Sequence, residues 1–398
     1  MLLFGFPFLG LVSSSKLALA ISLGFILIKP NKFNVVIESL ATKKMGGFIV
    51  ASLCVLCYTL FLTVLNAEND FSLFIKQLGG VMFIILVFVF YSVFRSWDIP
   101  TLIINAFILQ SVFISLAILN QDFYEMTSSL RSEVALNHLK TYGRLRGSAI
   151  SGYQFFGIST MYGFVLLYFI LKKNLSKTKN IIVLLFLSLI GIISGRYTAL
   201  AIILGLFIRF VFKSSFKSKF KLLFGGAIVI TIFGVTLNNV YNNHLDDQVI
   251  PVVDYYLKTP IENAINNGSA ETSSSNRLIE MYNDVEFSNI FCGDGRYLSK
   301  NNSGYYKSVD AGYLRILLYY GLFGIPLLFF LQYLILFKLS DNVTPDFFLK
   351  LAFFLYFVVL NLKGDVFFYS NNTLPIIIGF LYFYNHKMKK TTLSCSKT

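Results

Sequence analysis

The stretch Gly80-Val-Met-Phe-Ile-Ile-Leu-Val-Phe-Val-Phe-Tyr-Ser-Val-Phe94 decides the fold class, because it carries no charge and does not alternate apolar with polar residues. Ile181–Ser194 is a second run of the same kind. A helix needs about 20 mainly apolar residues to cross a bilayer, whereas a strand of a transmembrane barrel alternates over a short segment. These unbroken runs therefore predict membrane-spanning helices.

The composition of the whole chain supports the same class. Of 398 residues, 56% are hydrophobic and 14% are charged, and the mean hydropathy is +0.67. About 25% of the residues in an average soluble chain are charged, so a soluble globular protein is excluded. We expect an all-α, polytopic integral membrane protein with about 11–12 transmembrane helices. After one or two N-terminal spans, the expected spans run roughly over residues 47–65, 78–94, 101–119, 153–171, 181–194, 197–212, 222–240, 312–337, 347–362 and 373–384.

Long loops divide the chain into three regions. Residues 1–240 hold the N-terminal spans, with an outer loop at about 120–152. Residues 241–310 form a large outer loop with a short amphipathic helix, and residues 311–398 hold the C-terminal spans and a cytoplasmic tail. Most helix–helix connections have about 2–8 residues, so these loops are too long to be connectors.

The N-terminus has two readings. Met1–Val12 and Leu17–Ile28 are apolar runs separated by Ser13–Lys16, which predicts a tight hairpin with Lys16 at the outer surface. The alternative is one long helix that carries Lys16 within the membrane.

The net charge of +14 is concentrated in particular loops between the apolar spans. Basic runs at residues 29–44, 172–179, 209–221 and 387–397 adjoin apolar spans, and the positive-inside rule places them, with the C-terminus, in the cytoplasm. The positive charge then anchors loops to anionic lipid and does not indicate nucleic-acid binding. This assignment places most lysines in cytoplasmic loops but seven of the nine arginines on the outer side. The positive-inside rule counts charge alone and does not explain why arginine is preferred there. The seven arginines are Arg131, Arg144, Arg146, Arg196, Arg277, Arg296 and Arg315.

Several common chemistries lack their residues. His138, His244 and His386 are isolated, and no carboxylate or cysteine spacing resembles a metal site, so we expect no metal and no other cofactor. Cys54-Val-Leu-Cys57 lies within an apolar span, where packing explains it better than redox chemistry. Gly293-Asp-Gly295 follows no predicted strand, so a turn is favoured over a nucleotide-binding loop.

The outer arginines are candidates for binding an anion, because a guanidinium presents a planar fork of donors that matches phosphate oxygens. Arg196 stands alone in a minimal turn between two apolar runs, where a charge is costly without a partner. The alternative is an interfacial arginine that snorkels to lipid phosphates. Arg144 and Arg146 end the first outer loop. Arg277 lies at the start of the expected surface helix, where free N–H groups and the dipole attract an anion.

Short motifs connect the chain with a known family. Ser194-Gly-Arg-Tyr-Thr198, between two spans, looks like the small-Gly-Arg-Thr turn of Wzy-type O-antigen polymerases and the related O-antigen ligases. Arg146, followed after ten residues by Gly157, is similar to the arginine-to-glycine spacing of a polymerase outer loop. The large outer loop shows no second match of that spacing.

The exit from the large loop carries further resemblance. Phe291-Cys-Gly-Asp-Gly295, Asp310-Ala-Gly-Tyr-Leu314 and Tyr320-Gly-Leu-Phe-Gly324 follow one another in the order that these proteins use. Ligases of the superfamily place a histidine where this chain has Asp310. That difference favours a polymerase.

The resemblance implies an enzyme of the bacterial inner (cytoplasmic) membrane that joins polyprenyl-pyrophosphate-linked oligosaccharide repeat units at the periplasmic face. A sugar hydroxyl of one unit attacks the anomeric carbon of the growing chain, and polyprenyl pyrophosphate leaves. Cations that stabilise the departing charge are then Arg196 and Arg277, with Arg144, Arg146 and Arg296 as auxiliaries. The implied partners are the lipid-linked oligosaccharide, membrane lipids and a chain-length regulator protein.

Asp310 is the candidate general base, because it immediately precedes the expected span at Gly312. The alternative is a cap on the N-terminus of that helix. Tyr313 either stacks on a sugar ring or belongs to the interfacial aromatic belt. Two other functions stay open. One is an O-antigen ligase-type glycosyltransferase; the other is a lipid-linked oligosaccharide flippase or transporter, whose charges usually lie near the middle of broken helices.

Overall fold

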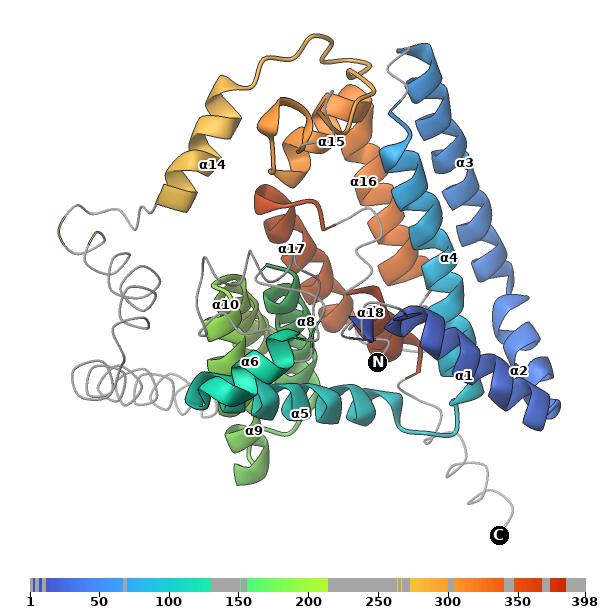
Figure 1. The fold of residues 1–398 in the computed structure, drawn as a ribbon, viewed down its shortest axis with the longest axis vertical. Coiled ribbons are helices and arrows are strands. Elements are labelled where there is room, and N and C mark those ends of the chain that lie inside the picture. Colours follow the sequence, from blue (N-terminus) through green and yellow to red (C-terminus); the bar gives the residue numbers. More distant parts are fainter. Residues whose placement is uncertain are drawn as a thin grey trace. The chain divides into compact units, whose positions relative to one another are not determined.

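The computed structural model describes residues 3, 7–8, 12–66, 70–129, 151, 156–213, 263, 266, 273–299, 304–339, 347–366 and 373–383. These residues are mostly helical (Figure 1). They belong to two compact units. The first comprises Met1–Phe6, Val12–Ala106 and Leu278–Thr398, and the second comprises Pro7–Leu11 and Phe107–Arg277.

Two short strands, β1 (Pro7–Phe8) and β2 (Val12–Ser13), precede the helices. The helices up to residue 129 are α1 (Ser14–Ile28), α2 (Asn31–Leu40), α3 (Lys43–Leu65), α4 (Ser72–Val93), α5 (Ile99–Leu119) and α6 (Gln121–Ser129). Those of residues 156–213 are α8 (Phe156–Lys172), α9 (Thr178–Ser194) and α10 (Tyr197–Ile208), with a π-helical turn at Arg209–Lys213. The later helices are α14 (Ser273–Asp284), α15 (Gly312–Tyr320), α16 (Gly324–Tyr333), α17 (Phe347–Lys363) and α18 (Leu374–Tyr382). Short helical turns lie at Tyr306–Ser308, Gly321–Phe323 and Leu334–Lys338.

Four helical segments of the described residues are long and apolar enough to cross a membrane: Lys43–Leu65, Ser72–Val93, Ile99–Leu119 and Gly312–Lys338. Shorter apolar helices cover Leu17–Ile28, Phe156–Lys172, Thr178–Ser194 and Tyr197–Phe212. The predicted helical class, with apolar helices of membrane length, is confirmed. The predicted number of spans stays a prediction, and the expected span at residues 222–240 lies outside the described residues.

Helices α3 and α4 pack side by side in the first unit, where Thr59 donates to Gln77 Oε1 at 2.8 Å. A capping hydrogen bond from Met45 N–H to Thr42 Oγ1, of 3.2 Å, starts α3. The last residues of α4 pack on α2, with the hydroxyl oxygens of Ser39 and Ser92 2.6 Å apart. One end of the α3–α4 pair therefore adjoins α2, and the connection from α3 to α4 lies at the opposite end.

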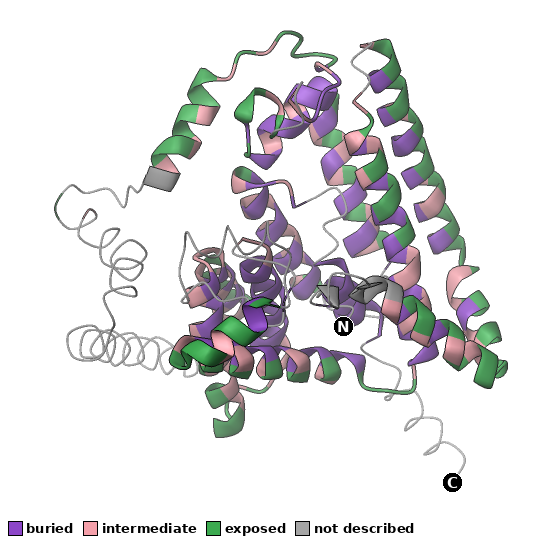
Figure 2. Ribbon diagram, viewed as in Figure 1, coloured by how far each residue is buried: buried purple, intermediate pink, exposed green. Residues whose placement is uncertain are grey.

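One face of α3 and of α4 is apolar yet exposed (Figure 2). Val64 on α3 and Ile75 on α4 are 63% and 65% exposed. Soluble proteins rarely present contiguous apolar surface of this kind. Contact with lipid chains accounts for it.

Helix α8 is the centre of the second unit, because every side chain from Ile158 to Leu171 is buried (Figure 2). It packs against α9 and α10. The junction is polar: Thr198 donates to Gly191 O at 2.7 Å, and the hydroxyl oxygens of Ser159 and Thr198 are 3.0 Å apart. A Cβ on Gly191 would lie 2.6 Å from the Thr198 methyl group, so only glycine permits this approach.

Two local predictions can be compared with the structure. Helix α1 begins at Ser14, after extended residues at Pro7–Phe8 and Val12–Ser13, so one long N-terminal helix is not observed. The rest of the predicted hairpin falls largely outside the described residues. The helix expected in the large loop is present as α14, and Leu278 and Met281 on one side of it pack against the buried cluster around Leu314.

Candidate functional site

A partly buried ionic cluster lies where α4, α17 and the loop after α14 meet, with the Asp365 side chain enclosed and that of Lys76 37% exposed. Lys76 Nζ is 2.7 Å from Asp365 Oδ2 and donates to the Tyr297 hydroxyl at 2.7 Å. The same hydroxyl donates to Asp365 Oδ2 at 2.9 Å. Lys76 is near the start of α4, and Asp365 follows the end of α17. The three side chains therefore close a polar triangle at one end of the apolar helices.

Arg315, on α15, completes this cluster. Its guanidinium carbon lies 3.5 Å from the centroid of the Tyr305 ring and 4.1 Å from that of Tyr297. Arg315 is 6% exposed, and within the described part of the chain its Nε and Nη2 atoms have no hydrogen-bond partner. Two aromatic rings thus hold a guanidinium whose donors are not all used.

The charges of the cluster decide its protonation. Burial opposes the ionised form of Asp365, but the positive charges of Lys76 and Arg315 and two hydrogen bonds lower its pKa to about 2. Burial and the Asp365 charge raise the pKa of Tyr297 far above its ordinary value. Asp365 is therefore a carboxylate and Tyr297 a neutral donor. A carboxylate held in this way is a poor proton acceptor.

Asp70 fixes the loop that carries Tyr297. Its Oδ2 accepts hydrogen bonds from the backbone N–H groups of Tyr297 and Leu298, at 2.6 and 2.7 Å. Its Oδ1 accepts from the Ser72 backbone at 3.1 Å. Burial alone would raise the pKa of Asp70, but a hydrogen bond from the Ser72 hydroxyl, together with these backbone hydrogen bonds, lowers it below its ordinary value. The loop between α14 and α15 is thereby attached to the start of α4.

Glycines of two motifs let the same loop dock on the end of α15. Gly293 and Gly321 have φ of +73° and +64°, in the left-handed region that favours glycine. A Cβ on Gly293 would lie 2.4 Å from Tyr319 O, and one on Gly321 would lie 2.2 Å from Phe291 O. Asp294 N–H donates to Leu318 O at 2.6 Å. The turn itself lies at Ile290–Cys292, just before the expected position, and Asp294 and Gly295 pair with the backbone of α15, so the two motifs are in contact.

A second set of cations surrounds Tyr306. Arg296 and Lys307 lie 5.6 and 5.4 Å from the centroid of that ring. Arg296 Nε donates to Leu298 O at 2.9 Å, and Lys307 Nζ is 3.5 Å from Asp294 Oδ2. The predicted auxiliary Arg296 thus belongs to the loop that forms the ionic cluster.

Asp310 and Tyr313 lie shortly before Arg315 in the sequence. Asp310 is exposed, and the residue that precedes the first turn of α15 is Ala311, without a side-chain cap. The capping alternative for Asp310 is therefore not what the structure shows. Tyr313 is half-buried, and its hydroxyl donates to Val358 O at 3.0 Å, so this hydroxyl has a structural partner.

The other predicted residues are distributed over the chain. Arg196 belongs to the second unit, half-buried at the residue before α10, next to the buried Thr198 of the same motif. Arg277 is exposed on α14. Because α14 begins at Ser273, Arg277 is beyond the first turn, and the expectation that free N–H groups surround it is wrong. Arg144 and Arg146 lie outside the described residues.

Sequence reasoning missed the members of the ionic cluster. Arg315 stood among the outer arginines but received no role, although it lies within the expected span at residues 312–337, where a charge marks a functional site. Lys76 is a lone charge that borders an apolar run, and Asp365 follows Lys363 at the end of another. That position is the signal that could have selected them.

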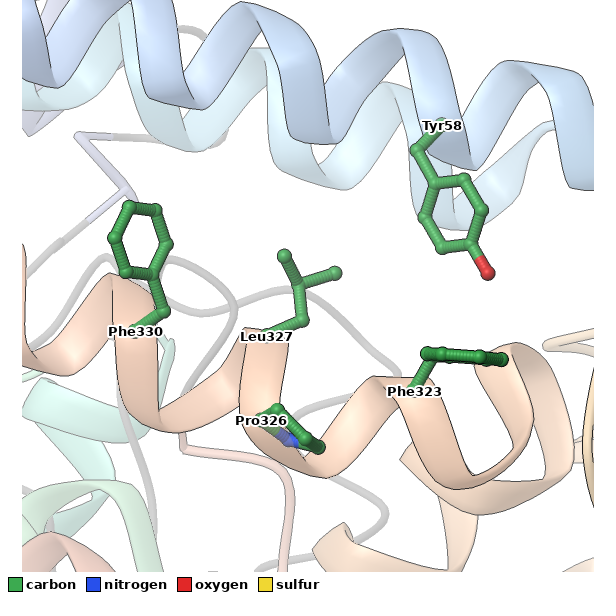
Figure 3. A pocket seen from close by; sticks show the side chains of 5 residues that line it. All are labelled: Tyr58, Phe323, Pro326, Leu327 and Phe330. Carbon is green, nitrogen blue, oxygen red and sulfur yellow. The ribbon is translucent and has the colours of Figure 1, made fainter.

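An apolar hollow of about 540 Å³ lies near this cluster, lined by Tyr58, Phe323, Pro326, Leu327 and Phe330. Tyr58 on α3 points toward α16, from which Leu327 and Phe330 point back (Figure 3). Tyr58 also stacks on Tyr320, whose hydroxyl accepts a hydrogen bond of 2.6 Å from Gln77, the neighbour of Lys76. The hollow and the ionic cluster are thus linked through Tyr320.

Among the described residues, no group of three or more His, Cys, Asp or Glu side chains could hold a metal ion. The site offers cationic side chains and tyrosine rings next to an apolar hollow. These groups suit an anionic ligand with an apolar part. Comparison with models of known protein families, with curated proteins and with solved structures finds no match.

Proposed function

We propose that the protein is a membrane glycosyltransferase that polymerises polyprenyl-pyrophosphate-linked oligosaccharide repeat units into an O-antigen or related surface polysaccharide. The observation that carries the proposal is the cluster of Lys76, Arg315, Tyr297 and Asp365 at one end of membrane-length helices. Its cations and rings suit a substrate that is anionic and carries sugars. The sequence motifs that resemble Wzy-type polymerases add to this support.

The distribution of charge favours an outward-facing site. Lys43 and Lys44 open α3 at the end that adjoins α2, and Arg95 follows α4 at that same end. The positive-inside rule assigns this basic end to the cytoplasm. Lys76 and Asp365 lie at the opposite end of α4 and thus on the periplasmic side of the inner membrane. The C-terminus is cytoplasmic in this arrangement.

The apolar hollow supports a lipid-linked substrate. A polyprenyl chain can lie along Leu327 and Phe330, within the membrane, while the oligosaccharide that it carries lies toward Tyr320 and the ionic cluster. The contacts from Tyr58 to Tyr320 and on to Gln77 join the two regions. One amphiphilic molecule therefore fits the arrangement better than a water-soluble sugar nucleotide.

We assign the roles of the site residues to this reaction. The exposed carboxylate of Asp310 accepts the proton of the attacking sugar hydroxyl. Asp365 is unsuited to this step, because its carboxylate is already paired with Lys76. On the resemblance in sequence alone, Arg196 and Arg277 stabilise the charge that builds on the departing pyrophosphate. Arg144, Arg146 and Arg296 serve as auxiliaries.

Deletion of the gene, followed by gel analysis of the surface glycan, tests the proposal. A polymerase predicts that the long ladder disappears while core carrying one repeat unit remains. Loss of the single-unit band as well would instead indicate a ligase or a flippase. A full ladder in the deletion strain would refute the function. Complementation with the intact gene is the control that ties the change to this protein.

A further inference from the structure

We infer that Arg315 binds a singly charged oxyanion, a carboxylate or a phosphodiester, through the Nε–Nη2 edge of its guanidinium. The inference rests on the proposed function, because the oxyanion belongs to the lipid-linked oligosaccharide. It names a subsite that the sequence motifs do not assign.

The two nitrogens of Arg315 without a hydrogen-bond partner in the described part of the chain are Nε and Nη2. They share one edge of the planar group, and their N–H bonds match two oxygens of a carboxylate or phosphate. The faces are taken by Tyr305 and Tyr297, at 3.5 and 4.1 Å. Only the edge remains to bind a ligand.

Unpaired buried donors are rare, and each requires an explanation. Arg315 is 6% exposed, so bulk solvent does not pair its donors fully. The nearby carboxylates have other partners: Asp365 Oδ2 accepts from Lys76 and Tyr297, and Asp70 Oδ2 accepts from two backbone N–H groups. A ligand oxyanion provides the missing acceptors.

The charges around Arg315 favour a ligand of charge −1. The cations Lys76 and Arg315 are balanced by Asp365 and Asp70. The adjoining set around Tyr306 holds two cations, Arg296 and Lys307, and one carboxylate, Asp294. Counted over the described residues of these two sets, the surplus is a single positive charge. A carboxylate or phosphodiester neutralises it, whereas a pyrophosphate would leave excess negative charge in a buried site.

Tyr305 gives the ligand a route to Arg315. Its ring covers one face of the guanidinium yet is 40% exposed, so Arg315 lies one side chain below the surface. A side chain on the neighbouring Gly304 would have no atom within 4 Å. Lys307 and Ser308 hold φ of 51° and 56°, and such left-handed conformations of non-glycine residues gather at ligand sites.

Ligand-detected NMR on the purified full-length protein in detergent tests the inference. The probes are glucuronate, which carries a carboxylate, dimethyl phosphate, which is a phosphodiester, and inorganic pyrophosphate. We expect Arg315→Lys to weaken binding of a singly charged probe by about tenfold or more, because an ammonium cannot form the two-point contact. Arg95→Lys, at the opposite end of α4, is the matched control and should bind like the unchanged protein.

The probe that binds identifies the source of the oxyanion. Binding of glucuronate alone assigns the subsite to an acidic sugar, and binding of dimethyl phosphate alone assigns it to a phosphodiester. The inference is wrong if no singly charged probe binds, if Arg315→Lys binds equally well, or if pyrophosphate binds most tightly. Tyr305→Leu, at a surface position, supplies a second variant should Arg315→Lys fail to fold. Without the Tyr305 ring, the Arg315 guanidinium is held less firmly, so binding of the singly charged probe should weaken severalfold. Unchanged binding of that probe contradicts the inference.

This binding test is separate from the ladder assay. A full ladder in the deletion strain refutes the proposed polymerase whatever the probes do. A lost ladder together with absent probe binding refutes only the role of Arg315.

Discussion

Replacing Asp365 by Asn should destabilise the first unit in a pH-dependent way. The positive charges of Lys76 and Arg315 lower the pKa of this buried carboxyl from 3.8 to about 2. A shift of that size corresponds to about 2 kcal/mol of folding free energy at neutral pH. Asn cannot carry the charge, so we expect Asp365→Asn to lose roughly that amount, about 2 kcal/mol.

The sign of the pH dependence follows from the lowered pKa. The stabilisation is fully present above pH 3.8, where the unfolded carboxyl is also ionised, and is lost as the pH falls towards 2. The stability gap between the unchanged protein and Asp365→Asn should therefore be constant from pH 7 to 5 and shrink below about pH 4. Asp284→Asn, an exposed acid on α14, should show almost no gap at any pH.

Thermal unfolding of the three purified proteins in one detergent, followed by circular dichroism between pH 7 and 3, measures the gap. Two results would contradict the reasoning. One is an Asp365→Asn protein as stable as Asp284→Asn at pH 7. The other is a gap that stays constant below pH 4, because the lost stability would then come from packing and not from the charge.

Three further predictions concern single residues. Arg196→Lys should abolish the glycan ladder at unchanged membrane expression, because an ammonium cannot replace a bidentate fork; a normal ladder would make Arg196 a membrane anchor only. Asp310→Asn should stop polymerisation of lipid-linked repeat units in detergent, including in chelator, where the unchanged protein should stay active; full turnover in the variant would move the base elsewhere. Gly293→Ala should lower the unfolding temperature, since left-handed backbone costs alanine about 1–3 kcal/mol and its Cβ would meet Tyr319 O at 2.4 Å. Gly304→Ala, in open space, is the control, and equal stability of the two would refute this reading.

The helices could be predicted from sequence, because hydrophobicity along the chain is a local property. The expected span at residues 47–65 corresponds to α3, and that at residues 101–119 corresponds to α5. The start of α3 four residues earlier, at Lys43, reflects the Thr42 cap, which lies outside the apolar run. Periodicity also located α14, whose apolar side packs on α15.

The ionic cluster could not be predicted in the same way. Lys76 meets Tyr297 across 221 residues and Asp365 across 289, and hydrophobicity does not encode which distant charges pair. Arg315 was one of the seven arginines assigned to the outer side, but no local pattern in the sequence indicated that two tyrosine rings would hold it. Asp70 was missed because its distant partners, the backbone N–H groups of Tyr297 and Leu298, have no side-chain motif that would announce them.

The long separation between Lys76 and Asp365 has a consequence for biogenesis. A ribosome adds about 5–20 residues per second, so Asp365 emerges about 15–60 s after Lys76. During that interval the α3–α4 hairpin waits in the bilayer with its lysine and Asp70 facing water or headgroups. Only after the last helices insert do these residues become a buried site. A chain truncated before residue 365 would lack the carboxylate that neutralises Lys76, and a membrane protease could distinguish such an unfinished chain from the complete protein by that unbalanced charge.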